Sequence, residues 1–310
     1  MLAIYFLLIL MISIWSFSFI VVDVLIEFIP SLSIAFYRFT IASIAYLLID
    51  LYQTLNKRKI DENNNLNLNK AYSKRDWIYI FISSLFGVSL FFFTQYSSIN
   101  LIGPSIPALF VCLLAPVIIA TLAIIFFKEK LGKIKIFGFI IATFGGFLLI
   151  SGGTIENLTP LSPNFLGYMF ALMTPVFWAI YSTISKKIGK TSSANRMNKY
   201  ICYLGTIELL ILLLINQELE ILIQNLSNPV LLLSSIYLGV GCYVIGYYIW
   251  QYAQKKLKSA KVASFLYIEP FLTLFFSLIF QRSDEVVIWN VLGGIIVLIA
   301  VLLINYERIH

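Results

Sequence analysis

The sequence predicts an all-α integral membrane protein with ten transmembrane helices, arranged as two inverted repeats of five helices. Three observations lead to this fold class. Hydrophobic residues make up 60% of the 310 residues and charged residues only 12%, with a mean hydropathy of +0.91, whereas about a quarter of the residues in a soluble domain are charged. Apolar runs recur at the length of a membrane span. A set of motifs recurs at a nearly constant distance along the chain.

The helices are predicted from apolar runs, because about 20 mainly apolar residues are needed to cross a hydrocarbon core about 30 Å thick. Ten segments meet this requirement: residues 2–22, 31–52, 77–97, 105–127, 134–152, 165–185, 199–216, 230–253, 261–281 and 287–305. The first segment has neither a basic start nor a small-residue cleavage pattern, so it is predicted to be a helix and not a signal peptide. The longest connection, residues 53–76, is polar, and no soluble catalytic domain is expected.

The distribution of basic residues predicts the orientation. Lys and Arg are retained on the cytoplasmic side during insertion, and 20 of the 22 basic residues fall in the even-numbered connections or the C-terminal tail. Both termini are therefore expected to be cytoplasmic, in a multi-pass protein of the plasma membrane. This topology also accounts for the net charge of +7, so nucleic acid is not expected as a partner.

The repeated motifs lie 154 to 156 residues apart. In the first half they are Gln95-Tyr96, Pro116, Glu129 and Gly138, and in the second half Gln251-Tyr252, Pro270, Asp284 and Gly293. Such a constant offset indicates a duplication, with a first repeat at 1–152, an external connection at 153–164 and a second repeat at 165–310. Five helices is an odd number, so the second copy enters the membrane from the opposite face, as in transporters that work by alternating access.

Three charged side chains fall at membrane depth, away from the ends of the predicted spans: Arg38, Glu208 and Glu269. A charge at membrane depth costs roughly 2.5–3.5 kcal/mol on insertion scales, so it normally faces a cavity or a partner. Glu269 precedes Pro270, which opens a helix locally, while the matching residue of the first half is Ala115. A substrate or proton contact and a structural hydrogen bond are both open for Glu269. Glu208 is predicted either to couple protons or to pair with Arg38, which otherwise anchors its helix or binds an anionic group.

Aromatic side chains provide further site candidates. Tyr243, Tyr247 and Gln251 follow one another at a spacing of four, so they share a helix face, and this face can hold an amphipathic solute by stacking and hydrogen bonding. Contact with lipid is the alternative for each aromatic residue taken singly. Trp15 and Trp178, in matching helices, either line a cavity or simply pack. The residues predicted to contact substrate are Glu269, Trp15, Gln95, Tyr96, Trp178, Tyr247 and Gln251, with helix breaks at Pro116 and Pro270.

Several of these motifs resemble the EamA-type branch of the drug/metabolite transporter superfamily. They are Trp15–Phe19, Phe36–Phe39, Lys128–Leu131, the stretch from Gly138 to Gly146, Trp178–Tyr181 and Glu269-Pro270. The resemblance covers nearly the whole chain and implies a ten-helix transporter of small metabolites, in a family that is similar to both exporters and importers. One departure is Asp284, which matches Glu129 in the repeat but lies on the outer side beside Glu285, so symmetric gates are not expected.

Other classes of function are disfavoured by what the sequence lacks. The only histidine is His310, so no histidine-based catalytic triad and no zinc site are expected, and the protein is predicted not to be an enzyme. The cysteines Cys112, Cys202 and Cys242 are scattered and are interpreted as small buried hydrophobes. No phosphate-binding loop is present, so no cofactor is expected and any uphill transport would draw on an ion or solute gradient.

The sequence thus predicts a secondary transporter, an exporter by preference, that moves a small polar or amphipathic metabolite such as an amino acid by alternating access. Counter-flow of a proton or solute belongs to this hypothesis. The alternative is a membrane scaffold or sensor built on the same duplicated fold. Gly138, Ala142 and Gly146 form a smooth helix face, as do Gly293 and Gly294 with their neighbours, which indicates scaffold contacts or a homodimer.

Overall fold

The computed structural model describes residues 2–56, 72–151, 165–189, 193–281 and 288–305, and every element in these residues is helical. The elements are α1 (Leu2–Ile26), α2 (Ser31–Asn56), α3 (Lys74–Ser84), η1 (Leu85–Ser89), α4 (Leu90–Ile102), α5 (Ser105–Phe127), α6 (Lys133–Ser151), α7 (Phe165–Gly189), α8 (Ala194–Ile215), α9 (Leu219–Asn225), α10 (Pro229–Ile236), η3 (Tyr237–Ile245), α11 (Gly246–Lys256), α12 (Ser259–Ala263), η4 (Ser264–Ile268), α13 (Glu269–Ile279) and α14 (Ile288–Asn305). The predicted connection 153–164 and Asp284 lie outside the described residues.

Eight helical stretches in the described residues are long and apolar enough to cross a membrane. They run over residues 2–26, 31–55, 74–102, 106–127, 165–189, 194–215, 229–256 and 259–279. Each coincides with one of the ten predicted spans. The remaining two predicted spans, 134–152 and 287–305, form the helices α6 and α14 but are not among these eight, so a count of ten spans stays a prediction, as does the inverted repeat.

Three spans change helical type along their length. The stretch α3–η1–α4 contains the π-helix η1, α10–η3–α11 contains the π-helix η3, and α12–η4–α13 contains the 3₁₀-helix η4. Pro270 stands in the first turn of α13, directly after η4, so this span changes helical type just before the proline. Pro116, in contrast, lies inside α5, which continues through it as one α-helix. The two π-helices occupy positions about one repeat length apart.

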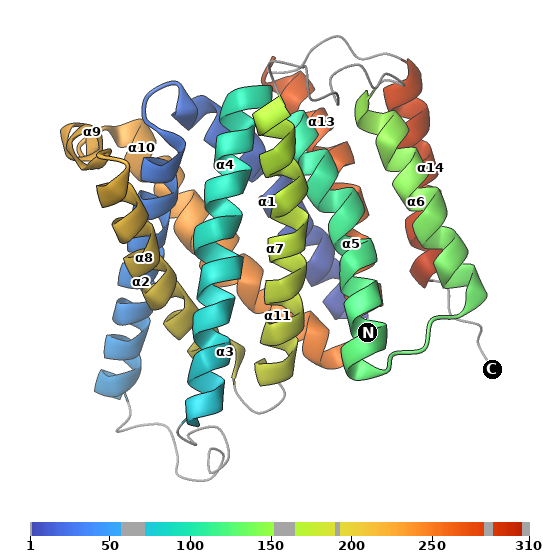
Figure 1. Cartoon of the computed structure of the whole chain (residues 1–310), viewed down its shortest axis with the longest axis horizontal. Helices are drawn as coiled ribbons and strands as arrows, with labels where there is room; N and C mark the ends of the chain where they lie inside the picture. Colours follow the sequence, from blue (N-terminus) through green and yellow to red (C-terminus); the bar gives the residue numbers. More distant parts are fainter. Residues whose placement is uncertain (1, 57–71, 152–164, 190–192, 282–287, 306–310) are drawn as a thin grey trace.

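The helices α6 and α14 lie side by side at one edge of the bundle, and α9 and α10 lie at the opposite edge (Figure 1). Glycine makes the α6–α14 contact close. A Cβ atom on Gly138 would lie 2.6 Å from Ile304, and one on Gly145 would lie 2.5 Å from Ile296. The smooth face predicted for this helix therefore packs within the chain, through Gly145 in addition to Gly138, while the surroundings of Gly146 are outside the described residues.

Candidate functional site

A cavity of about 40 Å³ lies inside the bundle, between helices of both halves. Its lining residues are Trp15, Ser18, Phe19, Arg38, Phe91, Phe92, Gln95, Val111, Trp178, Tyr247, Leu266 and Glu269. We call this space the central cavity. Its volume has room for only a few water molecules, so a metabolite requires the surrounding helices to move apart.

The structure brings most of the sequence-predicted site residues into this one wall. Trp15, Gln95, Trp178, Tyr247 and Glu269 line the central cavity, and so does Arg38. The other two predicted contacts do not line the cavity. They are Tyr96, which accepts a hydrogen bond from Arg38, and Gln251, whose amide nitrogen donates to Tyr181 and Asn198.

Glu269 presents a carboxylate to the central cavity from the first turn of α13, and its side chain is 4% exposed. The Sγ of Cys112 donates to Glu269 Oε2 over 3.2 Å, and no cation pairs with this carboxylate among the described residues. Ser16 on α1 donates to the backbone oxygen of Glu269, which ties the first turn of α13 to the helix that carries Trp15.

Arg38 presents the opposite charge from α2 and is 3% exposed. Its Nη1 donates to the hydroxyl of Tyr96 over 2.5 Å, and the guanidinium lies 4.2 Å from the ring centre of Phe92. The Nε of Arg38 has no hydrogen-bond partner in the described residues. The pairing of Arg38 with Glu208 considered from the sequence does not form, because Glu208 accepts hydrogen bonds from Ser84 and Ser89 instead.

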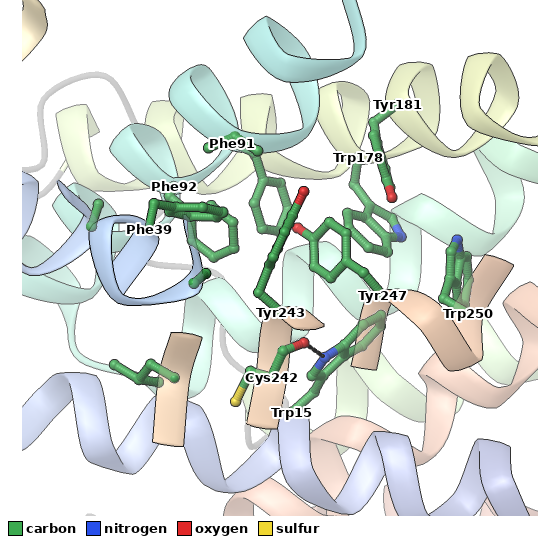
Figure 2. Packing of buried hydrophobic residues seen from close by; sticks show 14 of the residues in the cluster. Trp15, Phe39, Phe91, Phe92, Trp178, Tyr181, Cys242, Tyr243, Tyr247 and Trp250 are labelled. Carbon is green, nitrogen blue, oxygen red and sulfur yellow. Dashed lines mark hydrogen bonds between the residues drawn. The ribbon is translucent and has the colours of Figure 1, made fainter. Parts of the chain in front are cut away.

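Aromatic rings surround the space between these two charges. Trp15 and Trp178 meet edge to face with ring centres 5.3 Å apart, and Tyr247 lies 5.9 Å from the first and 5.4 Å from the second (Figure 2). The indole nitrogen of Trp15 donates to the backbone oxygen of Cys242 over 2.9 Å, whereas that of Trp178 has no partner in the part of the chain described. Both tryptophans therefore line the cavity and also pack.

A second cluster lies where α5 and α7 end and α12 begins, on the side predicted to be cytoplasmic. Lys186 at the end of α7 donates to Glu129 Oε1 and to Ser259 Oγ, over 2.7 Å in both cases, and the Ser259 backbone N–H donates to the same carboxylate oxygen. We call Glu129, Lys186 and Ser259 the latch. Burial on its own raises the pKa of Glu129, but the hydrogen bonds from Lys186 and Ser259 outweigh it and lower the pKa below the usual value.

Sequence reasoning missed several of the contacts that position the site. Cys112 was interpreted as a small hydrophobe, yet its thiol contacts Glu269. Gly246 leaves the space that the Trp15 indole occupies, because a Cβ atom there would lie 2.4 Å from the Trp15 indole nitrogen. Asn198 and Lys186 are common residue types without a motif, so no signal in one sequence distinguishes them from other polar residues.

Several known proteins are similar to this chain. It is 24% identical to an uncharacterized transporter of Archaeoglobus fulgidus over 95% of this chain and 94% of that protein, and 25% identical to the uncharacterized transporter YyaM of Bacillus subtilis over 89% and 84%. A crystal structure of another protein has a similar fold, with a TM-score of 0.68 and 17% identity, over 98% of this chain and 97% of that one.

The EamA-like transporter family matches this chain over residues 2–151 and again over residues 165–306. These two stretches leave out little besides the segment between the halves. The two relatives above, both named as transporters, match this chain over most of its length. The protein is thus a multi-pass membrane protein, and it belongs to the EamA-like transporter family.

Proposed function

We propose that this protein is a secondary active transporter of a small amphipathic metabolite, such as an amino acid. The observation that supports this best is that Arg38 and Glu269 face one aromatic cavity while neither has an ion pair among the described residues. Buried charges without a counter-charge are costly in a membrane protein and mark functional sites. A solute with both an acid group and an amine group supplies the counter-charge of each.

Two further unpartnered groups support a ligand in the same place. The Nε of Arg38 and the indole nitrogen of Trp178 are buried donors without an acceptor in the residues described. Buried polar groups nearly always have a partner, so a solute with acceptor oxygens satisfies donors that the protein leaves open. The rings of Trp15, Trp178 and Tyr247 would then contact the apolar part of this solute.

The proposed mechanism is alternating access between two inverted repeats of five helices, with both termini cytoplasmic. It is supported by the two stretches that match the family and by the latch, which joins Glu129 of the first half to Lys186 and Ser259 of the second. In this mechanism the latch would separate and re-form as the two halves move against each other. Export across the plasma membrane, counter-flow of a proton or solute, and a homodimer belong to the same proposal, with export chosen because the resembled family includes many exporters.

Ligand-dependent thermal stabilisation of the purified protein tests the site. Amino acids, nucleotides, sugars and polyamines are screened one by one. A ligand that binds only the folded state, at a concentration a hundred times its Kd, stabilises the protein by about 2.7 kcal/mol. We expect an amino acid to raise the melting temperature of the wild type and to have no effect on Glu269→Gln. Uptake of that amino acid into inside-out vesicles then measures the direction of transport.

The control is Glu220→Gln, which removes an exposed carboxylate of α9, a helix that contributes no residue to the cavity lining. This variant should respond to the ligand as the wild type does. If no solute stabilises a protein that is shown to be folded, or if Glu269→Gln keeps the full response, the cavity is not the binding site, and the scaffold or sensor alternative gains support.

A further inference from the structure

The carboxylate of Glu208, in the middle of α8, lies outside the central cavity and contacts a different part of the structure. Its Oε1 lies 2.6 Å from the hydroxyl of Ser84, and its Oε2 accepts a hydrogen bond from Ser89. Ser84 is the last residue of α3 and Ser89 the last residue of η1. Glu208 therefore joins the two ends of a π-helical segment, a rare element that is frequent at functional sites.

No charged side chain compensates this carboxylate. Its partners in the described residues are the two serines alone, and no ionised or titratable group of α2, α3, η1, α7 or α11, the elements packed against α8, acts on it. The charged residues of these elements lie toward their ends, apart from Arg38, which Tyr96 holds at the cavity. A bare carboxylate at membrane depth is unfavourable, so another positive charge is needed here.

The hydrogen-bond geometry indicates that a proton on Glu208 Oε1 can supply this charge. The Ser84 hydroxyl has a single proton, yet its oxygen lies within hydrogen-bond distance of two acceptors, Glu208 Oε1 at 2.6 Å and the backbone oxygen of Phe81 at 2.8 Å. A hydroxyl donates once and accepts through its lone pairs. With one more proton on Oε1, the carboxylic acid donates to Ser84, Ser84 donates to Phe81, and every close contact is satisfied.

The same π-helical segment is connected to the central cavity. The backbone oxygen of Gly87, in the middle of η1, accepts a hydrogen bond of 3.0 Å from the hydroxyl of Tyr247, which lines the cavity. Gly87 packs so closely that a Cβ atom would lie 2.3 Å from the ring of Tyr181, and Gly205, one turn before Glu208 on α8, has similarly little room beside Val88. A change at either end of η1 is thus passed on through close contacts.

We propose that Glu208 and Ser84, with the backbone oxygen of Phe81, form a proton-binding site outside the cavity, and that this proton is the ion coupled to transport. When the proton leaves Oε1 for water, the Ser84 hydroxyl turns from Phe81 to the ionised carboxylate. That exchange alters the junction of α3 and η1, and with it the position of the Gly87 oxygen that holds Tyr247. Only the coupling step rests on the proposed transport function; the proton site does not.

Infrared spectroscopy of the purified full-length protein tests the site without any substrate. The readout is the C=O stretching band of a buried, protonated carboxylic acid, followed from a pH of about 5 to about 9, above the ordinary range of carboxyl groups. Glu269→Gln serves as the background, so that Glu269 does not contribute. We expect a band that titrates in this background and that is lost in the Glu208→Gln, Glu269→Gln double variant. Identical spectra of the two proteins over the whole range would overturn the proposal.

Serine variants test the hydrogen-bond relay in the same background. Ser84→Ala and Ser89→Ala should each raise the pH at which the band disappears, because the ionised form loses a charge-assisted hydrogen bond, which is about twice as strong as a neutral one. Ser83→Ala is the matched control, since Ser83 is also buried in α3 but its hydroxyl has no partner in the described residues. An equal response of Ser83→Ala and Ser84→Ala would contradict the relay.

The link to the cavity has its own readout, the tryptophan fluorescence that Trp15 and Trp178 contribute. In the Glu269→Gln background we expect the emission to change with the same midpoint as the infrared band, and this change to be lost with Glu208→Gln and with Tyr247→Phe. A band that titrates without any change in fluorescence would leave a proton site but overturn its coupling. A ligand that stabilises the wild type while no band belongs to Glu208 would support the transporter and refute this site.

Discussion

Trp15 holds its position in the cavity wall because a residue on another helix has no side chain. Its indole nitrogen donates to the Cys242 backbone oxygen, and a Cβ atom on Gly246 would lie 2.4 Å from that nitrogen. No Cβ atom in a real structure tolerates such a distance, so any side chain at Gly246 must displace Trp15. The aromatic wall therefore depends on a contact that neither residue type predicts alone.

Gly246→Ala is expected to destabilise the protein and to weaken ligand binding together. Overpacking in a buried site costs typically about 1–3 kcal/mol, and displacement of Trp15 opens the ring cluster with Trp178 (Figure 2). The melting temperature in detergent and the ligand-dependent rise in that temperature measure the two effects.

The matched control is Gly241→Ala in the same span, where the nearest atom to a new Cβ would be 3.6 Å away. This variant has ordinary contacts and should melt within about 0.5 kcal/mol of the wild type, the range of changes without a specific mechanism. Equal destabilisation by the two alanines would mean that Trp15 does not depend on Gly246 for its position.

At the scale of elements, α6 and α14 are held together by close backbone approach. A Cβ atom on Gly145 would lie 2.5 Å from Cγ2 of Ile296, 2.8 Å from its Cβ and 3.1 Å from the Gly293 oxygen. Small residues at such interfaces allow helices to gain contact area inside a membrane, where apolar burial between helices offers little driving force. This pair lies at the edge of the bundle (Figure 1), so its loss should leave the cavity intact.

Gly145→Ala should lower the melting temperature, by an amount that corresponds to about 1–3 kcal/mol of overpacking, without loss of ligand binding. Ile296→Ala in the same chain removes Cγ2, the nearest colliding atom at 2.5 Å, and leaves the Cβ at 2.8 Å, so it should restore only part of the stability. Gly132→Ala is the control, because nothing lies within 4 Å of a Cβ atom there. Additive effects of the two alanines in place of a rescue would show that these side chains do not collide.

The sequence predicts those elements that local features determine, and it does not predict those that depend on contacts between distant residues. Residues 105–127 were expected as a span and form α5 over the same residues, because hydrocarbon thickness dictates the length of an apolar run. The π-helix η1 was not foreseen. Its Gly87 oxygen accepts a hydrogen bond from Tyr247, 160 residues away, and a contact between such distant residues leaves no local pattern.

The same distinction holds for the site. Glu269 and Arg38 are recognisable because a charge within an apolar run is rare, and Trp15 and Trp178 because they stand in matching helices. The thiol of Cys112 and the ammonium of Lys186 are not recognisable, because their residue types are ordinary for a buried helix and for a helix end. Their roles come from the partners Glu269 and Glu129, which only the fold brings near.

At the scale of the whole molecule, the latch connects the two halves of the chain. The side chains of Lys186 and Glu129 are 11% and 10% exposed, and Ser259 adds two hydrogen bonds from the start of α12. If the halves move against each other during transport, this cluster must open on the side predicted to be cytoplasmic. Its strength then contributes to the balance between closed and open conformations.

Glu129→Gln is expected to lower the melting temperature at neutral pH, because Lys186 loses its counter-charge, and a hydrogen bond to a charged group contributes about 1.5–3 kcal/mol. Since the pKa of Glu129 is lowered in the folded protein, its contribution to stability is fully present above the unfolded value of about 4.3. It is lost as the pH falls through the lower, folded value. The difference in melting temperature between wild type and Glu129→Gln should therefore be constant above a pH of about 5, decline as the pH falls below the unfolded value, and disappear once the pH is below the folded one.

Asp50→Asn provides the comparison, because Asp50 also pairs with a lysine, Lys199, at 2.8 Å but with 41% of its side chain exposed. Exposed pairs contribute about 0–1 kcal/mol, so this variant should melt close to the wild type at every pH. If Glu129→Gln behaved in the same way, the latch would contribute no more to stability than a surface ion pair, and the contact between α5, α7 and α12 would depend on packing. A difference confined to Glu129→Gln, and lost in acid, would show that the charge on this one carboxylate stabilises the protein through the latch.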